Sequence, residues 1–476
     1  MPSRDHGSGP VAPGADGFLR ERALDVLLDP ALGHIVALVC WIENGVVHAA
    51  DAAGHVALPS SGEPVVLAGR DPLSDQDPFS DSSTAYPYAA DRLQSLFSDA
   101  RAPDLVVVHT GAHHWPERGG HLGEHGSLNG VQSRAPLLVS GAGVTARGVL
   151  DRVARVVDVG ATLARLAGGS TAGMDGRPFE EAGLGAAHVV GLLWDGAQCA
   201  DLLALAADGT LPHVARLLAD GCAFRGGVLA EFPSVTLVNH TSALTGVGPG
   251  RHGIVHNAFF DRATGQQVVP NAPATWHAAM QWLRPGVTTV FERLPADAMS
   301  ACVNDPVDVG ATYSTFALLR ESGTEGPGAL MGALPPATAD PHASQQYVVE
   351  LDYAWATQVD AAGLEQVRQL WRAPVPPRLT WWNTTLTDSG HHAGGPGSPI
   401  ARAALRDADS RLGCWLDEVA ARGLLADTVI LLTADHGSQG AEPGCNGDWD
   451  EALRAAGVPF RDEAYGFLYL GSDVTG

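Results

Sequence analysis

Three apolar stretches that each run into an aspartate constrain the fold of this chain most. VVGLLW is followed by Asp195, LTWWNTTLT by Asp388, and TVILLTA by Asp435, with His436 next to it. Helical patterns lie between these stretches, so strands alternate with helices along the chain. This alternation predicts a doubly wound, mostly parallel α/β sheet with helices on both faces, whose ligand-binding edge carries the polar residues beyond the strand ends.

Each of these polar residues also has a plain structural explanation. An aspartate after a strand often caps the next helix, and this is the alternative explanation for Asp195. An Asp-His pair in a turn is often simply exposed to solvent and has no role in a site. The neighbours His391 and His392 can be a chance doublet. Taken together, however, three carboxylates and two imidazoles on one sheet edge suit one or two divalent ions, and the imidazoles favour zinc.

The stretch EFPSVTLVNHTSALTGVGPGRHGIVHN, residues 231–257, brings a hydroxyl group to a predicted helix start. Apolar residues recur at helical spacing from Leu237, and a glycine-rich turn over residues 246–253 ends the pattern. Thr236 therefore lies beside unpaired backbone N–H groups and the positive end of the helix dipole, a setting that stabilises an alkoxide or a phosphate. The alternative is that Thr236 is only the helix N-cap.

The charged residues exclude several classes of protein. The chain has 476 residues, a net charge of -24 and no lysine. This composition argues against binding to a nucleic-acid duplex, which needs a basic face, and it removes a P-loop lysine and a lysine Schiff base as mechanisms. The six cysteines are scattered without a CxxC pair, so neither a disulfide framework nor a zinc-thiolate site is predicted.

The N-terminal residues 1–17 are polar and glycine-rich, and we expect them to be disordered. The sequence shows neither an apolar signal core nor a run of about 18 apolar residues, which predicts a cytoplasmic protein without a membrane partner. The oligomeric state is not indicated.

Residues 18–185 are expected to contribute a small β-rich portion followed by buried strands. The predicted elements are a helix over 18–29, short hairpin-linked strands over 35–41, 46–50 and 64–69, a helix over 89–97, a parallel-type strand over 104–110, a strand over 134–141 and a helix over 149–166. Residues 186–476 contain the three aspartate-ending strands, plausible strands over 287–291 and 300–303, and a surface insertion over 322–344.

The segments FPSVTLVNHTS, GRHGIVHN, DSGHHAGGP and ADHG resemble, in this order, the nucleotide pyrophosphatase/phosphodiesterase (type I phosphodiesterase) branch of the alkaline phosphatase superfamily. The resemblance implies an alkaline-phosphatase-like fold and two divalent ions, expected to be zinc. It implies that Thr236 is the nucleophile and that Asn257 donates to a phosphoryl oxygen. The implied ligands of one ion are Thr236, Asp195, Asp435 and His436, and those of the other include Asp388 and His392.

One histidine that the family needs is missing from the usual place, because none follows His436. The segment EHGSLNGVQSRAPLLVSGAGV near the front resembles the family's last segment, so the chain looks circularly permuted and His125 would supply the ligand. Permutation is tolerated where chain ends lie close together on the surface. The alternatives are His121, then His113, His114 or solvent, and an unrelated domain over residues 1–185.

The resemblance implies hydrolysis of a phosphodiester or nucleotide pyrophosphate, through a phosphothreonine intermediate, on a small-molecule substrate that can be a nucleotide. The alternatives on the same scaffold are a phosphomonoesterase, a phosphonate hydrolase or a catalytically silent binding protein. A sulfatase is disfavoured because the sequence has no Cys-x-Pro-x-Arg segment. A phosphoglycerate mutase would be expected to use a serine and basic residues that hold a sugar phosphate.

Overall fold

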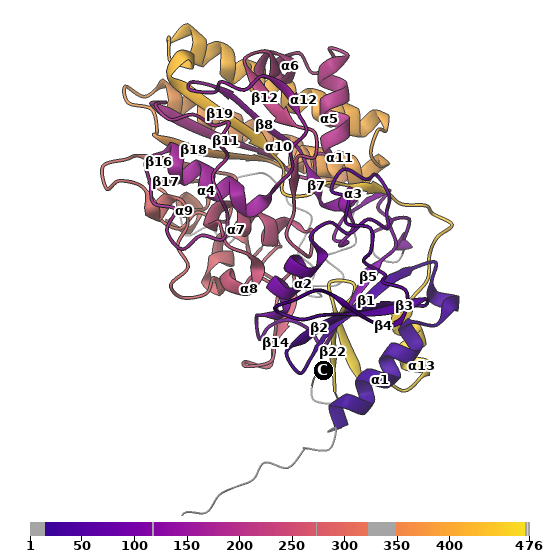
Figure 1. Ribbon diagram of the computed structural model, residues 1–476. Helices are drawn as coiled ribbons and strands as arrows, with labels where there is room; N and C mark the ends of the chain where they lie inside the picture. Colours follow the sequence, from indigo (N-terminus) through magenta and orange to yellow (C-terminus); the bar gives the residue numbers. More distant parts are fainter. Residues whose placement is uncertain (1–14, 117–118, 273, 322–348, 472–473, 475–476) are drawn as a thin grey trace, which may run out of the picture.

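The computed structural model describes residues 15–116, 119–272, 274–321, 349–471 and 474. Two large sheets dominate it, one in the upper and one in the lower part of Figure 1. We call the eight-stranded sheet the central sheet and the seven-stranded one the outer sheet. The predicted insertion over 322–344 lies outside the described residues.

The central sheet has the order β17-β16-β18-β11-β19-β8-β12-β9. Its strands are β8 (Leu137–Gly141), β9 (Gly148–Leu150), β11 (His188–Trp194), β12 (Gly221–Phe224), β16 (Ser300–Val303), β17 (Tyr313–Ser314), β18 (Leu379–Thr384) and β19 (Thr428–Thr433). Only β8 runs antiparallel to its neighbours, β19 and β12. The predicted mostly parallel α/β sheet is therefore confirmed.

Helices cover both faces of the central sheet, as predicted. Alternation along β18 separates the two faces: Trp381 packs against β11 at Gly191, beside Leu163 of α4, whereas Thr380 accepts a hydrogen bond from Trp371 of α10. The helices of this part of the molecule are α4 (Val156–Leu166), α5 (Cys199–Ala207), α6 (Pro212–Ala219), α7 (Thr236–Thr245), α8 (Pro249–His252), α9 (Thr315–Glu321), α10 (Val349–Arg372), α11 (Leu386–Gly394) and α12 (Pro399–Ala421).

The outer sheet is antiparallel, with the order β21-β22-β5-β1-β2-β3-β4. Its strands are β1 (Val36–Glu43), β2 (Val46–Asp51), β3 (Gly54–Leu58), β4 (Val65–Gly69), β5 (Leu105–His109), β21 (Phe460–Glu463) and β22 (Phe467–Leu470). Helix α2 (Ala89–Phe97) covers one face, and α1 (Ala15–Leu27) and α13 (Trp449–Ala455) cover the other.

Both large sheets contain strands from the front and from the rear of the chain. In the central sheet, β8 pairs with β19, and in the outer sheet β5 pairs with β22. Shorter pairings also connect the sequence: β7 (Arg134–Ala135), β10 (Ala154–Arg155) and β13 (Val228–Leu229) form one small sheet, β6 (Gly123–Glu124) pairs with β20 (Gln439–Gly440), and β14 (Phe259–Asp261) with β15 (Gln266–Val268).

Three predicted elements differ from the structure. The run over 104–110 becomes β5 of an antiparallel sheet; it is continuously apolar because helices cover both faces of that sheet. The helix expected over 149–166 begins only at Val156, where the Asp158 carboxylate accepts from the Arg155 backbone N–H. The strand expected over 287–291 is a turn that leads into a 3₁₀ helix, Phe291–Arg293.

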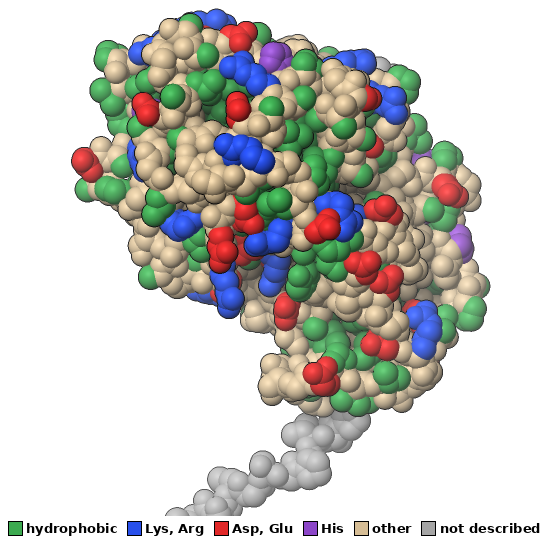
Figure 2. All heavy atoms as spheres, turned by 45° about the horizontal axis from the view of Figure 1, so that its top comes forward, with side chains coloured by type: hydrophobic (Ala, Val, Ile, Leu, Met, Phe, Trp, Pro, Cys, Tyr) green, Lys and Arg blue, Asp and Glu red, His purple; other side chains and the backbone are tan. Residues whose placement is uncertain are grey.

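Arginine and acidic side chains are interspersed on the face shown in Figure 2. Among the described helices, none alone is both long and apolar enough to cross a membrane, and the bent pair formed by α5 and α6 meets that test by length and composition only.

Candidate metal centre

Thr236 is the first residue of α7, and it is not the helix cap, because Val235 occupies the N-cap position. From Leu237 to Thr245 the helix is buried, whereas Thr236 remains partly exposed. Gly246, with φ +68°, ends the helix in the left-handed conformation that glycine adopts most easily. Thr236 thus lies, partly exposed, at the positive end of a buried helix.

Asn257 is tied to the same helix end. Its Oδ1 accepts from the backbone N–H of Leu237 at 3.0 Å, and since an N–H can only donate, this contact fixes which amide atom is oxygen. Asn257 is partly exposed, and its Nδ2 group can therefore donate a hydrogen bond to a bound molecule.

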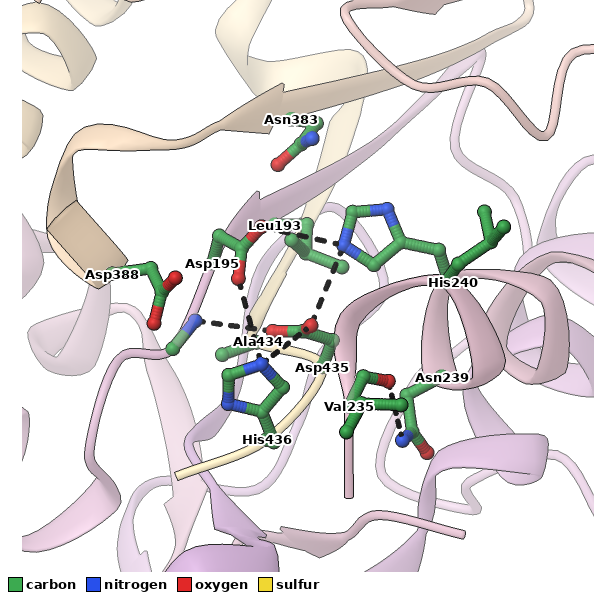
Figure 3. Close-up of polar contacts among 12 residues, drawn as sticks. Leu193, Asp195, Val235, Asn239, His240, Asn383, Asp388, Ala434, Asp435 and His436 are labelled. Carbon is green, nitrogen blue, oxygen red and sulfur yellow. Dashed lines mark hydrogen bonds and ion pairs between the residues drawn. The ribbon is translucent and has the colours of Figure 1, made fainter. Parts of the chain in front are cut away.

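A first cluster of potential ligands forms beyond β11 and β19. Asp195 follows β11, and Asp435 and His436 follow β19, the strand that pairs with it in parallel. His436 Nε2 lies 3.1 Å from Asp435 Oδ2 and 3.7 Å from Asp195 Oδ1 (Figure 3). All three residues are buried, and together they form a group that could hold a metal ion.

A second cluster contains a histidine from the front of the chain. His392 Nε2 lies 3.1 Å from Asp388 Oδ2, one turn away on α11, and His125 Nε2 lies 4.0 Å from Asp388 Oδ1. These three residues also form a group that could hold an ion. The neighbouring His391 faces away from this group, with Nδ1 2.9 Å from the carbonyl oxygen of Gly196.

Backbone and side-chain contacts connect the segments that carry the two clusters. The Gly196 N–H donates to Asp435 Oδ1 at 3.1 Å, and the Thr387 hydroxyl donates to the Asp195 carbonyl at 2.5 Å. Gly196 has φ +66°, and a Cβ atom there would lie 2.5 Å from Asp388 Oδ1. Glycine at this position therefore lets the strand-end loop pass close to α11.

The carboxylates of the centre perturb one another. Burial, reinforced by the charges of Asp435 and Asp388, raises the pKa of Asp195 well above its ordinary value. Burial would also raise the pKa of Asp435, but the facing imidazoles of His436 and His240 lower it to about 2. This crowding of buried acceptors favours the binding of positive charge.

The donor set fits divalent ions. The buried side-chain atoms without a hydrogen-bond partner among the described residues include four of the two clusters: Asp195 Oδ1, Asp435 Oδ2, Asp388 Oδ1 and His436 Nε2. Buried polar atoms are normally satisfied, so these orphaned atoms call for a ligand that can bind several of them. Carboxylate oxygens together with imidazole nitrogens are a typical zinc donor set.

His121 lies beside the second cluster. Its ring centroid is 4.0 Å from that of His392, and its Nδ1 is 3.5 Å from Glu124 Oε1. These three residues form a third potential ion-holding group that shares His392 with the second cluster. His113 packs instead against the ring of Trp115, at 4.1 Å.

Sequence reasoning missed two residues next to the centre, His240 and Asp305. His240 lies one turn after Thr236 on α7, so its position on the same helix face was a usable signal. Asp305 follows β16, a further parallel strand of the central sheet, so the rule applied to the other strand ends would have found it.

A pocket adjoins Thr236 and Asp195. Trp276 and Trp355 stack with ring centroids 5.4 Å apart at its wall. Asn271 and Asn383 also line the pocket and add amide groups to an aromatic surface.

Comparison with known proteins identifies the family. The model described as type I phosphodiesterase / nucleotide pyrophosphatase matches residues 189–471, more than half of the chain. The chain therefore belongs to the type I phosphodiesterase / nucleotide pyrophosphatase family, as the sequence motifs predict.

Individual relatives match shorter or more distant stretches. An uncharacterised pyrophosphatase/phosphodiesterase of Schizosaccharomyces pombe is 48% identical over 46 residues, 10% of each chain. Murine ectonucleotide pyrophosphatase/phosphodiesterase 5 is 18% identical with a TM-score of 0.41, over 58% of this chain and 64% of that one. Phosphonoacetate hydrolase of Sinorhizobium meliloti is 22% identical with a TM-score of 0.35, over 56% and 59%. The chain thus spans less than two thirds of each relative.

Proposed function

We propose that this chain is a metal-dependent hydrolase of phosphate esters, acting as a phosphodiesterase or nucleotide pyrophosphatase on small molecules such as nucleotides. The observation that carries the proposal is the convergence of two Asp/His clusters on the helix end that presents Thr236. The match to the family model supports the same chemistry.

We assign two zinc ions to the two clusters. Asp195, Asp435, His436 and Thr236 would hold one ion, and Asp388, His392 and His125 would hold the other. When bound, such ions supply positive charge that favours the alkoxide form of a hydroxyl group and offsets charge on the oxygens around phosphorus.

Thr236 is then the nucleophile of a two-step displacement. Its Oγ1 attacks phosphorus, the bond to the leaving-group oxygen breaks, and that oxygen departs with the electron pair, leaving a phosphothreonine. Water next attacks phosphorus, the Thr236 oxygen departs and regains a proton, and phosphate or a phosphomonoester is released. Asn257 Nδ2 donates to a phosphoryl oxygen, where negative charge grows in the transition state.

We also propose that the chain is circularly permuted relative to its family, with residues 18–185 equivalent to the family's C-terminal part and joined with residues 186–476 in one α/β domain. Several contacts support this proposal. His125 Nδ1 lies 3.1 Å from the Ser234 carbonyl, just before the nucleophile helix, and β8 pairs with β19. The family model, moreover, begins only at residue 189.

Turnover of chromogenic esters by the zinc-loaded protein tests the function. We expect faster hydrolysis of bis(p-nitrophenyl) phosphate than of p-nitrophenyl phosphate. Preference for the monoester would make the protein a phosphomonoesterase, and activity on phosphonates alone would make it a phosphonate hydrolase. A protein that binds no metal and turns over none of these compounds would be a silent binding scaffold.

A further inference from the structure

His240 forms a buried bridge between the nucleophile helix and the first cluster. Its Nε2 lies 3.7 Å from Asp195 Oδ2 and 3.5 Å from Asp435 Oδ2. Figure 3 shows these two carboxylates between the ring of His240 on one side and that of His436 on the other. The side chain of His240 is 1% exposed, so water does not screen these contacts.

The other ring nitrogen of His240 faces Asp305. His240 Nδ1 lies 2.9 Å from Asp305 Oδ2. Asp305 is itself immobilised, because Oδ2 accepts from Trp381 Nε1 at 2.7 Å and Oδ1 accepts from the Val307 N–H at 2.9 Å. Because this carboxylate is held at both oxygens, its charge favours the ring orientation in which Nδ1 faces Asp305 and Nε2 faces the cluster.

The oxygens of the two carboxylates have different surroundings. The Gly196 N–H holds Asp435 Oδ1, and His240 faces Asp195 Oδ2. The remaining oxygens, Asp195 Oδ1 and Asp435 Oδ2, are the two that face His436 and have no hydrogen-bond partner among the described residues. His240 Nε2 thus lies between the oxygen of Asp195 that does not face His436 and the oxygen of Asp435 that does, within 3.7 Å of both.

We infer that His240, oriented by Asp305, is a positioning residue that holds Asp195 so that its Oδ1 faces the metal position, and that it couples this position to Thr236 through one turn of α7. This inference rests on the proposed function, since it assigns a role towards the proposed ion. Groups that orient metal ligands in this way typically change affinity or activity by about 10- to 100-fold when removed.

Three substitutions of His240 separate positioning from simple space filling. The amide nitrogen of glutamine reaches about as far as Nε2, whereas that of asparagine reaches only as far as Nδ1. We expect His240→Asn to weaken zinc binding at one of the two sites by about 10- to 100-fold and to lower kcat on bis(p-nitrophenyl) phosphate similarly. His240→Gln should restore zinc affinity to within about threefold of the parent, whereas His240→Met, which fills a similar volume but has no N–H donor, should not.

Zinc affinity is measured by competition with a chromophoric chelator, and folding by circular dichroism. His188→Gln is the matched control: His188 begins β11, the strand that ends before Asp195, and its Nδ1 contacts the Pro377 carbonyl at 2.8 Å. This control should match the parent. If His240→Asn does not fold, Asp305→Asn replaces it, and we expect a weakening of about tenfold at the same site.

The outcomes are distinguishable. A parent that binds no divalent ion would overturn the proposed function together with this inference. A zinc-binding parent whose His240→Asn or Asp305→Asn variant keeps both affinities would overturn the inference alone. Equal zinc affinities in folded His240→Gln and His240→Met variants would also overturn it, because they would indicate that only the volume of the side chain matters.

Discussion

The imidazole ring of His125 stacks on that of His436, with ring centroids 3.7 Å apart and an angle of 17° between the planes. The first residue comes from the front third of the chain and the second from the end of β19. Their contact places a front-segment histidine at the centre formed by Asp195, Asp388 and Asp435, which is the arrangement that a permuted chain order requires.

Replacing His125 by alanine should remove one metal site and leave the other. His125 contributes a nitrogen to the second cluster only, so we expect about one zinc ion per chain in the variant and two in the parent, as measured by atomic absorption after dialysis. His121→Ala is the matched control and should keep both ions. The reverse pattern would assign the ligand to His121, and unchanged zinc in both variants would contradict the proposed permutation.

Replacing Asn257 by aspartate should separate the hydrogen bond that Oδ1 accepts from the proposed donation by Nδ2. Aspartate keeps an oxygen that can accept from the Leu237 N–H but lacks the Nδ2 donor. If the donor acts on a phosphoryl oxygen, kcat should fall by about 10²- to 10³-fold with zinc content unchanged, as for other donors to developing charge. A variant with nearly parental kcat would show that Asn257 serves only as a helix cap.

The stability of the protein should depend on pH through Asp360 of α10. Asp360 accepts from the Thr385 and Leu386 N–H groups at the start of α11, and burial, partly offset by these bonds, raises its pKa to about 7. Between about pH 4 and pH 7 the folded protein then holds a proton that the unfolded chain has lost, so stability falls as pH rises through this window.

Asp360→Asn should remove that dependence. The contribution is about 1.4 kcal/mol per pH unit inside the window. Urea midpoints at pH 5 and pH 7 should therefore differ less in Asp360→Asn than in the parent. Equal differences in the two proteins would contradict the raised pKa.

The sequence predicted the parts of this molecule whose signals are local. The apolar runs that end before Asp195 and Asp435 are buried strands of the central sheet, as expected, and the structure shows that they are neighbours. The antiparallel pairing of β5 was not predicted, because β5 is buried on both faces and so lacks the alternation that marks a half-exposed strand. Pairings such as β5 with β22 depend on contacts between distant segments, which local patterns do not encode.

From the sequence, only those site residues that belong to recognisable motifs could be predicted. Asp388 and His392 were expected beyond a strand, and the structure places them one turn apart on α11, where helical spacing brings them together. His240 and Asp305 were not predicted, because neither residue by itself has a sequence signal that distinguishes it from a structural residue. Their role depends on a 2.9 Å contact between residues on α7 and beyond β16.

The central claim is that Thr236 attacks phosphorus, and turnover of bis(p-nitrophenyl) phosphate by Thr236→Ala at full zinc occupancy tests it most directly. We expect kcat to fall by at least about 10³-fold, as is typical when a nucleophile is removed, with the circular dichroism spectrum unchanged. A folded, zinc-loaded Thr236→Ala protein that turns over the diester at the parental rate would contradict the account.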